Sequence, residues 1–153
     1  MKKNNGILKN DEMHIQQLSV FLEDRSGRLT ELTRILAEND INIIALNVAE
    51  TTDYGIVRMV VGRPQLAKET LEREGFSIGL TDVACVNMAD EPGSLYKILK
   101  ILAEKEVNVD YMYAFSNDDV ALGVIRTENI TEVTKLLEER GIMLLSQNDI
   151  YQL

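Results

Sequence analysis

The chain has 153 residues, a formal net charge of −9 and a sequence pI near 4.6. Because nucleic acids and anionic membrane surfaces attract basic proteins, this acidic balance argues against both as partners. Hydrophobic residues make up 45% of the chain, yet no apolar run approaches the ~20 residues that a membrane helix needs. We therefore expect a folded protein that does not span a membrane and that binds small molecules or other proteins.

The only cysteine is Cys85, and the only histidine is His14. A single cysteine cannot form an internal disulfide, which is typical of the reducing cytoplasm, where we expect this chain to lie. A zinc-type site or a Cys-His dyad would need such residues close together. The sequence therefore predicts no metal site, no cofactor and no catalytic residue.

Residues 1–15 precede the first regular pattern and begin with MKKNNGILKNDEM. They contain lysines but no uninterrupted apolar segment and no small-residue cleavage site, so they do not match a secretory signal. We interpret them as a mobile N-terminal tail.

The rest of the chain is an internal repeat with an offset of about 66 residues. Residues 18–42 read LSVFLEDRSGRLTELTRILAENDIN, and residues 84–108 read ACVNMADEPGSLYKILKILAEKEVN. We expect two small domains, 16–82 and 83–153. Because a core of fewer than ~70–80 residues supplies only a few kcal/mol of net stability, we expect the two copies to pack together and the chain to form a homodimer.

The first copy alternates apolar and polar residues over 16–23, which predicts a strand, and then changes to helical spacing from Leu29 to about residue 39. Runs rich in β-forming residues at 41–49 and 54–61 predict a hairpin. A helix over 65–74, ended by Gly75, and a strand over 76–80 complete the copy. The same order is predicted in the second copy over 83–89, 95–104, 107–115, 120–127, 130–140 and 142–146.

This β-α-β-β-α-β order predicts the fold class: α+β, with two ferredoxin-like units, each an antiparallel sheet carrying two helices on one face. The second strand of the first copy is apolar on both faces, with Ile43 and Ala45 assigned to one face. Either the helix-free face or the edge should therefore be covered by another copy. In the second copy we assign one face and a core role to the stripe Val109, Tyr111, Tyr113 and Phe115.

The candidate ligand site is the loop between the first strand and the first helix of each copy. The loop residues are Asp24, Arg25, Ser26, Gly27, Arg28 and Leu29 in the first copy, and Asp90, Glu91, Pro92, Gly93, Ser94 and Leu95 in the second. A helix start presents unpaired N–H groups and a partial positive charge that can hold a carboxylate, and glycine allows close approach.

The aspartates can accept hydrogen bonds from an ammonium group, and Asn42 or Asn108 can both donate and accept. Together these groups match a free α-amino acid. A structural alternative stays open, because aspartate before a helix is often an N-cap, glycine a turn residue and asparagine a residue that closes the connection to the next strand.

The pattern D-x-x-G-x-L, followed by a helix and then V/I-N-I/V, occurs in both copies and resembles the ACT domain. The resemblance implies regulation by an amino acid that binds between the loop of one copy and the start of the second strand of a neighbour. It therefore adds Asn42 with Ile43 and Asn108 with Val109 to the candidate site. The two loops differ in charge, since Arg25 corresponds to Glu91, and Ser26 stands where the family often has proline.

Two copies leave little further chain for an enzyme, and the sequence has no C-x-x-C, no basic aromatic RNA-binding motif and no phosphate-binding glycine loop. We therefore expect a stand-alone tandem ACT protein that senses a free amino acid. The alternative is an interaction module or regulatory subunit that packs on a partner enzyme and binds no metabolite.

Overall fold

The computed structural model describes residues 13–23, 25–50, 54–118 and 120–153. Its elements are β1 (Ile15–Glu23), α1 (Arg28–Glu38), β2 (Ile43–Glu50), β3 (Tyr54–Val61), α2 (Pro64–Arg73), β4 (Ser77–Ala89), α3 (Ser94–Glu104), β5 (Val109–Asn117), β6 (Val120–Thr127), α4 (Ile130–Glu139), β7 (Met143–Leu144) and α5 (Gln147–Tyr151). Most of the expected tail, 1–15, lies outside the described residues. Its last residue, Ile15, begins β1 and is fully buried.

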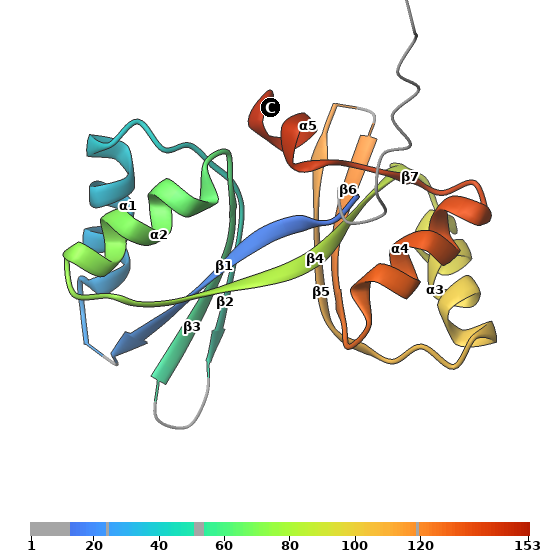
Figure 1. Ribbon diagram of the computed structural model, residues 1–153, viewed down its shortest axis with the longest axis horizontal. Coiled ribbons are helices and arrows are strands. Elements are labelled where there is room, and N and C mark those ends of the chain that lie inside the picture. Colours follow the sequence, from blue (N-terminus) through green and yellow to red (C-terminus); the bar gives the residue numbers. More distant parts are fainter. Residues whose placement is uncertain (1–12, 24, 51–53, 119) are drawn as a thin grey trace, which may run out of the picture.

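The strands form one seven-stranded sheet in the order β2-β3-β1-β4-β6-β5, with β7 also pairing with β4. Two ferredoxin-like units are visible in this order, and the predicted fold class is confirmed. Unit 1 contains β2, β3, β1 and the first half of β4, and unit 2 contains the second half of β4 with β5, β6 and β7. Helices α1 and α2 lie at one end of the molecule, α3 and α4 at the other, and the strands lie between them (Figure 1).

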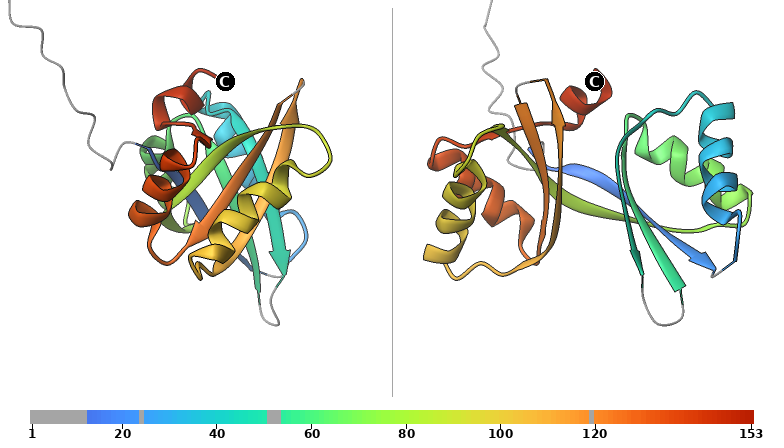
Figure 2. Two further views of the ribbon diagram at one scale, coloured as in Figure 1. Left: turned by 90° about the vertical axis from the view of Figure 1, so that its right-hand side faces the viewer. Right: turned by 180° about the vertical axis from the view of Figure 1, so that it is seen from behind.

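Strand β4 belongs to both units, so the prediction of separate strands over 76–80 and 83–89 was wrong. Its first half pairs with β1 as far as Val83, and its second half pairs with β6 from Ala84. Only Thr81 and Asp82 separate the two predicted strands, and neither residue breaks a strand as glycine or proline would. The expected domain boundary after residue 82 therefore lies inside a continuous strand, and β1 and β4 cross between the units (Figure 2).

The repeat is also visible in the backbone, because three pairs of residues with the same offset adopt left-handed conformations. These pairs are Gly27 and Gly93 (φ 89° and 92°), Asp40 and Glu106 (both 54°), and Gly75 and Gly141 (87° and 75°). Each pair lies where a helix begins or ends. Since left-handed φ values are uncommon for residues other than glycine, their recurrence at Asp40 and Glu106 shows that the helix-to-strand turn is built alike in both copies.

Both faces of the sheet carry a hydrophobic core, and the helix-free face is covered by the other copy, as the apolar second strand predicted, although Leu46 and Val48 of β2 stay exposed. Each unit has its own core between helices and sheet, and a third cluster that includes Ala45, Cys85 and Val124 lies between the helix-free faces of the two units. The face assignments of Ile43 and Val109 were wrong, because each strand has a bulge directly after that residue. The extra residue turns Ile43 and Val109 toward the helix-side cores of their own units.

A buried polar bridge joins the two units through Gln17, which is fully buried in β1. Its Nε2 donates to the Tyr111 hydroxyl at 2.7 Å, and the Tyr113 hydroxyl donates to its Oε1 at 2.8 Å. Arg58 of β3 stacks on the Tyr111 ring with its Cζ 3.8 Å from the ring centroid. The aromatic stripe of β5 therefore packs against unit 1, in line with the predicted core role.

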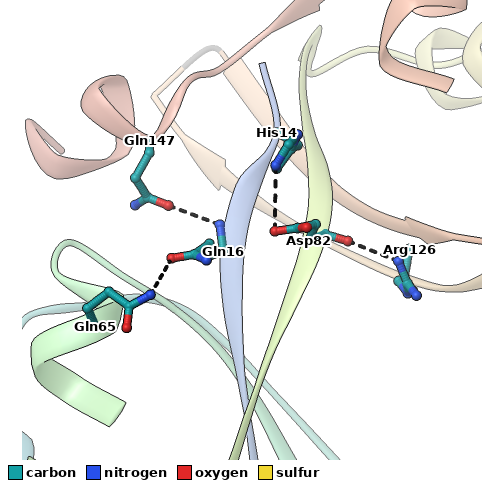
Figure 3. Close-up of polar contacts among 6 residues, drawn as sticks. All are labelled: His14, Gln16, Gln65, Asp82, Arg126 and Gln147. Atoms are coloured by element: carbon teal, nitrogen blue, oxygen red, sulfur yellow. Dashed lines mark hydrogen bonds and ion pairs between the residues drawn. The ribbon is translucent and has the colours of Figure 1, made fainter. Parts of the chain in front are cut away.

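The C-terminal helix α5 has no counterpart in unit 1 and was not predicted. It packs on unit 1, since its fully buried Ile150 joins the cluster between the units. Two hydrogen bonds connect the units in this region (Figure 3): Gln16 N to Gln147 Oε1 at 3.0 Å and Arg126 Nη1 to the Asp82 carbonyl at 3.2 Å. Within unit 1, Gln65 Nε2 donates to Gln16 Oε1 at 3.3 Å, and His14 Nε2 lies 3.6 Å from Asp82 Oδ1. None of the described helices is long and apolar enough to cross a membrane.

Candidate ligand site

Strand direction determines which residues can meet at each loop. Strands β1 and β2 both pair antiparallel with β3, so they run parallel to each other. The loop after β1 therefore lies beside the C-terminal end of β2. Asn42 precedes the N-terminal end of β2, so it lies at the opposite end of the strands. The same holds in unit 2, where β4 and β5 flank β6 and Asn108 lies away from the second loop. Each unit thus separates its own loop from its own asparagine.

The loop of unit 2 borders a pocket of about 320 Å³. Its lining residues are Met88, Ala89, Asp90, Glu91, Ser94, Leu95, Ala114, Phe115, Ser116 and Ala121. Four of them belong to the predicted loop: Asp90, Glu91, Ser94 and Leu95. The lining residues include two carboxylates and no basic side chain, so the pocket favours a ligand that carries a positive group.

Asp90 is held toward the end of β5 and does not cap the helix. Its Oδ2 accepts a hydrogen bond from the Ser116 hydroxyl at 3.1 Å. The N-cap of α3 is Gly93, whose φ is 92° and which has no side chain with which to cap the helix. The Ser94 N–H already donates to the Glu91 carbonyl at 3.3 Å, so the N–H groups that follow it in the first turn of α3 are the ones that could bind a carboxylate beside Asp90. An ammonium acceptor and a carboxylate donor thus lie on one loop.

The remaining predicted residues of unit 2 lie outside this pocket. Pro92 and Gly93 are exposed in the loop. Asn108 is exposed directly before β5, at the end of the strands opposite to the loop. Val109 is half-buried against the helix-side core of unit 2. A second chain would be needed to place an asparagine beside this loop.

In unit 1 the corresponding loop differs. Asp24 lies outside the described residues, and Arg25, Ser26, Gly27 and Leu29 are exposed. The Nε of Arg25 lies 3.6 Å from Glu23 Oε2, an exposed pair that adds little to stability.

Two other predicted residues of unit 1 lie at the start of β2, at the end of the strands opposite to the loop. Asn42 is exposed, and Ile43 packs against the core of unit 1. Arg28 differs from the rest of the loop because it is buried, and it lines a separate pocket of about 310 Å³.

Sequence reasoning missed Ser116, Ala114 and Phe115, which form the β5 wall of the unit 2 pocket. The signal was available in the predicted topology. In a β-α-β-β-α-β unit the first two strands run parallel, so the end of the second strand adjoins the loop after the first. In the sequence repeat Glu50 corresponds to Ser116, so the residue type at this position differs between the copies.

Two buried groups outside this pocket have perturbed acidity: burial raises the pKa of the Cys85 thiol to about 12, and burial raises the pKa of the Tyr113 hydroxyl above its ordinary range. Both groups are therefore protonated near neutral pH, and Cys85 is not a ready nucleophile. Within the described part of the chain, no group of three or more His, Cys, Asp or Glu side chains could hold a metal ion.

Comparisons with known proteins identify the family and the fold. A family profile described as an ACT domain pair matches residues 13–153. The crystal structure of protein BT0572 from Bacteroides thetaiotaomicron is similar, with 42% sequence identity and a TM-score of 0.88 over 92% of this chain and 98% of that one. A search of curated proteins found no match.

More distant structures share the fold. The ligand-free regulatory subunit of aspartate kinase from Thermus thermophilus has 20% identity and a TM-score of 0.62, over 84% of this chain and 93% of that one. The regulatory subunit of aspartate kinase from Thermus flavus has 19% identity and a TM-score of 0.57, with the same coverage of 84% and 93%.

Proposed function

The chain belongs to the family of ACT domain pairs, and from this membership we propose that it is a regulatory protein that senses a free amino acid and has no catalytic activity of its own. One observation carries the proposal. The loop of unit 2 combines Asp90, held by Ser116, with an uncapped helix start on the wall of a pocket of about 320 Å³.

In the proposed complex the ligand ammonium binds Asp90, and the ligand carboxylate accepts hydrogen bonds from N–H groups in the first turn of α3, after Ser94. The side chain of the amino acid packs against apolar walls provided by Met88, Leu95 and Phe115. Hydrogen bonds to a charged ligand group are shorter and stronger than those between neutral groups, so Asp90 should dominate the affinity.

The proposed site is completed by a second chain. In each unit the asparagine and the residue after it lie at the end of the strands opposite to the loop; the pairs are Asn42 with Ile43 and Asn108 with Val109. Only a neighbouring copy could therefore bring one of these pairs to the loop. Ligand binding would then be coupled to homodimer formation, because both chains contribute to one site. This coupling gives the protein a means of regulation. The buried free thiol of Cys85 accords with a cytoplasmic location.

An alternative function is an interaction module that packs on a partner enzyme without a metabolite. The favouring observation is the edge of unit 1, where Leu46 and Val48 of β2 are 41% and 52% exposed. Strand β2 ends the sheet on this side, and an edge strand with exposed apolar side chains invites pairing with another chain. The regulatory subunits of aspartate kinase that share this fold carry a partner enzyme in their names.

A thermal-shift screen with the twenty amino acids separates the two functions. A ligand present at 100 times its dissociation constant stabilises the native protein by about 2.7 kcal/mol, which raises the melting temperature by roughly 2–4 °C per kcal/mol. We expect one chemical class of amino acid to give this shift, and Asp90→Asn to reduce the stabilisation at the same ligand concentration to about 0.4–1.4 kcal/mol. The matched control is Glu128→Gln, an exposed carboxylate in the turn between β6 and α4. If no amino acid stabilises the wild-type chain, the sensing function is wrong.

A further inference from the structure

We propose that unit 1 contains a second small-molecule site, which binds an organic carboxylate through the guanidinium group of Arg28. The site does not depend on the amino-acid site of unit 2. Its pocket, of about 310 Å³, is lined by residues of β1, the start of α1, the start of β3, and the turn from α2 to β4 with Ser77. This volume lies within the usual range of ligand pockets, which begins at roughly 300 Å³.

Arg28 is held in place but is not fully paired. It is 9% exposed, and its Cζ lies 4.1 Å from the centroid of the Phe76 ring. Its Nη1 donates to Glu31 Oε2 at 2.9 Å, whereas its buried Nε has no acceptor among the described residues. Nearly all buried polar groups in proteins are paired, so this one needs an explanation.

The unpaired side of the guanidinium group fits a carboxylate. Arginine binds carboxylates through two parallel N–H groups, and the edge formed by Nε and Nη2 is not used by Glu31. Stacking on Phe76 fixes the plane of the group, so little side-chain freedom would be lost on binding. The arginine is therefore arranged in advance for a planar, two-oxygen partner.

Charge and shape restrict the ligand further. Besides Arg28, the pocket is lined by the carboxylate of Glu23, and Glu31 already neutralises part of the arginine charge. A singly charged carboxylate suits this balance better than a phosphate dianion. The rings of Phe21 and Tyr54 lie edge to face with centroids 5.8 Å apart, and they are 42% and 43% exposed. They form an apolar wall for a hydrophobic or aromatic group on the ligand.

The repeat supplies an internal comparison. At the positions of Arg28 and Phe76, unit 2 has Ser94 and Ile142, so it has neither the cation nor the ring that fixes it. The carboxylate site is therefore specific to unit 1, and we expect one site per chain.

The test uses the full chain and phenylacetate, which joins a carboxylate to an aromatic ring. The Nε–H signal of Arg28 in a ¹H–¹⁵N spectrum reports directly on the unpaired group. We expect phenylacetate to shift this signal with saturation at one ligand per chain, and the neutral isostere phenylacetamide to leave it unchanged. Phenyl phosphate is the test for phosphate, and we expect it to bind more weakly than phenylacetate.

Two variants and one control accompany the titration. Arg28→Lys keeps the charge but loses the two-pronged geometry, so phenylacetate should bind at least about ten-fold more weakly, as expected for a lost hydrogen bond between charged groups. Phe21→Leu, at a half-exposed position, keeps the protein folded and should weaken binding by a smaller factor. Arg34→Lys changes an exposed arginine of the same helix, paired with Glu38, and should have no effect.

Three results would overturn the proposal: no shift of the Arg28 Nε–H signal at saturating phenylacetate, equal binding of phenylacetamide, or equal affinity of the wild type and Arg28→Lys. Tighter binding of phenyl phosphate would overturn the assignment to a carboxylate. The Asp90→Asn variant separates the two sites in the amino-acid screen, because an amino acid that bound only at Arg28 would stabilise this variant as much as the wild type.

Discussion

The bridge at Gln17 gives the sharpest prediction about stability. Gln17→Leu keeps a side chain of similar size but removes the hydrogen bonds to Tyr111 and Tyr113, whose donor-acceptor distances are 2.7 and 2.8 Å. A buried hydrogen bond contributes about 0.5–1.5 kcal/mol, so losing these two should lower the free energy of unfolding by about 1–3 kcal/mol, and loss of the longer one from Gln17 Nε2 to the Ser19 hydroxyl (3.3 Å) adds to this. For a chain of this length each kcal/mol shifts the melting temperature by about 2–4 °C.

Urea unfolding followed by circular dichroism measures this change. A double-mutant cycle with Tyr113→Phe isolates the single hydrogen bond between Tyr113 and Gln17, and we expect a coupling free energy of about 0.5–1.5 kcal/mol. Because the units share β4, the wild type and Gln17→Leu should each unfold in one transition. The reasoning is refuted if Gln17→Leu leaves the free energy of unfolding unchanged, or if the wild type unfolds in two separate transitions.

Three further predictions concern stability. Ile150→Ala empties a fully buried position between α5 and unit 1, so it should cost about 2–5 kcal/mol in urea unfolding, and a smaller loss than 1 kcal/mol would show that α5 does not hold the units together. Gly93→Ala should lower the free energy of unfolding by about 1–2 kcal/mol, because the φ of Gly93 is 92°. Gly79→Ala is the control: nothing described lies within 4 Å of the added Cβ at either glycine, but Gly79 has no positive φ, so this cost should be absent. Equal losses in the two variants would contradict the prediction. Burial raises the pKa of Cys85 from 9.0 to about 12, so the thiol ionises at lower pH in the unfolded chain than in the folded protein. The free energy of unfolding should therefore fall between these pH values by up to about 1.4 kcal/mol per pH unit, and Cys85→Ala should lack this component. Parallel pH profiles of the free energy of unfolding for the wild type and Cys85→Ala would contradict the prediction.

Much of the fold was readable because local patterns and tertiary structure agree. The strand over 54–61 was predicted with its observed bounds, since turn residues precede it and Gly62 with Pro64 follows it. The merging of two strands into β4 was missed because the repeat alignment suggested a boundary where no strand-breaking residue stands. The bulges after Ile43 and Val109 depend on the partner strand and cannot be read from alternation in one strand.

Helix α5 did have a sequence signal. Ser146 and Asp149 form a capping box, in which the Ser146 hydroxyl accepts from the Asp149 N–H and the Asp149 carboxylate accepts from the Ser146 N–H. The spacing of these two residues is typical of a helix start. Its packing on unit 1 was not predictable, because it depends on how the two units face each other.

The candidate site was predictable in part for the same reason. The loop residues Asp90 and Ser94 were identified from the repeat, and the pocket contains both. Ser116 was missed because its contact with Asp90 joins residues 26 positions apart in the sequence. A difference in charge between the two loops was expected from Arg25 and Glu91, which are equivalent in the repeat. The larger difference is at the next pair of charged and uncharged residues, where unit 1 has the buried Arg28 and unit 2 has Ser94.

The central claim, that a free amino acid binds at the loop of unit 2, is tested most directly by a ¹H–¹⁵N titration of the full chain with the amino acid that the thermal screen identifies. We predict saturable shifts of the backbone amide signals of Gly93, Ser94 and Leu95, and about ten- to a hundred-fold weaker binding in Asp90→Asn. The claim is contradicted if these three signals stay unchanged while others shift, or if Asp90→Asn binds the amino acid as tightly as the wild type.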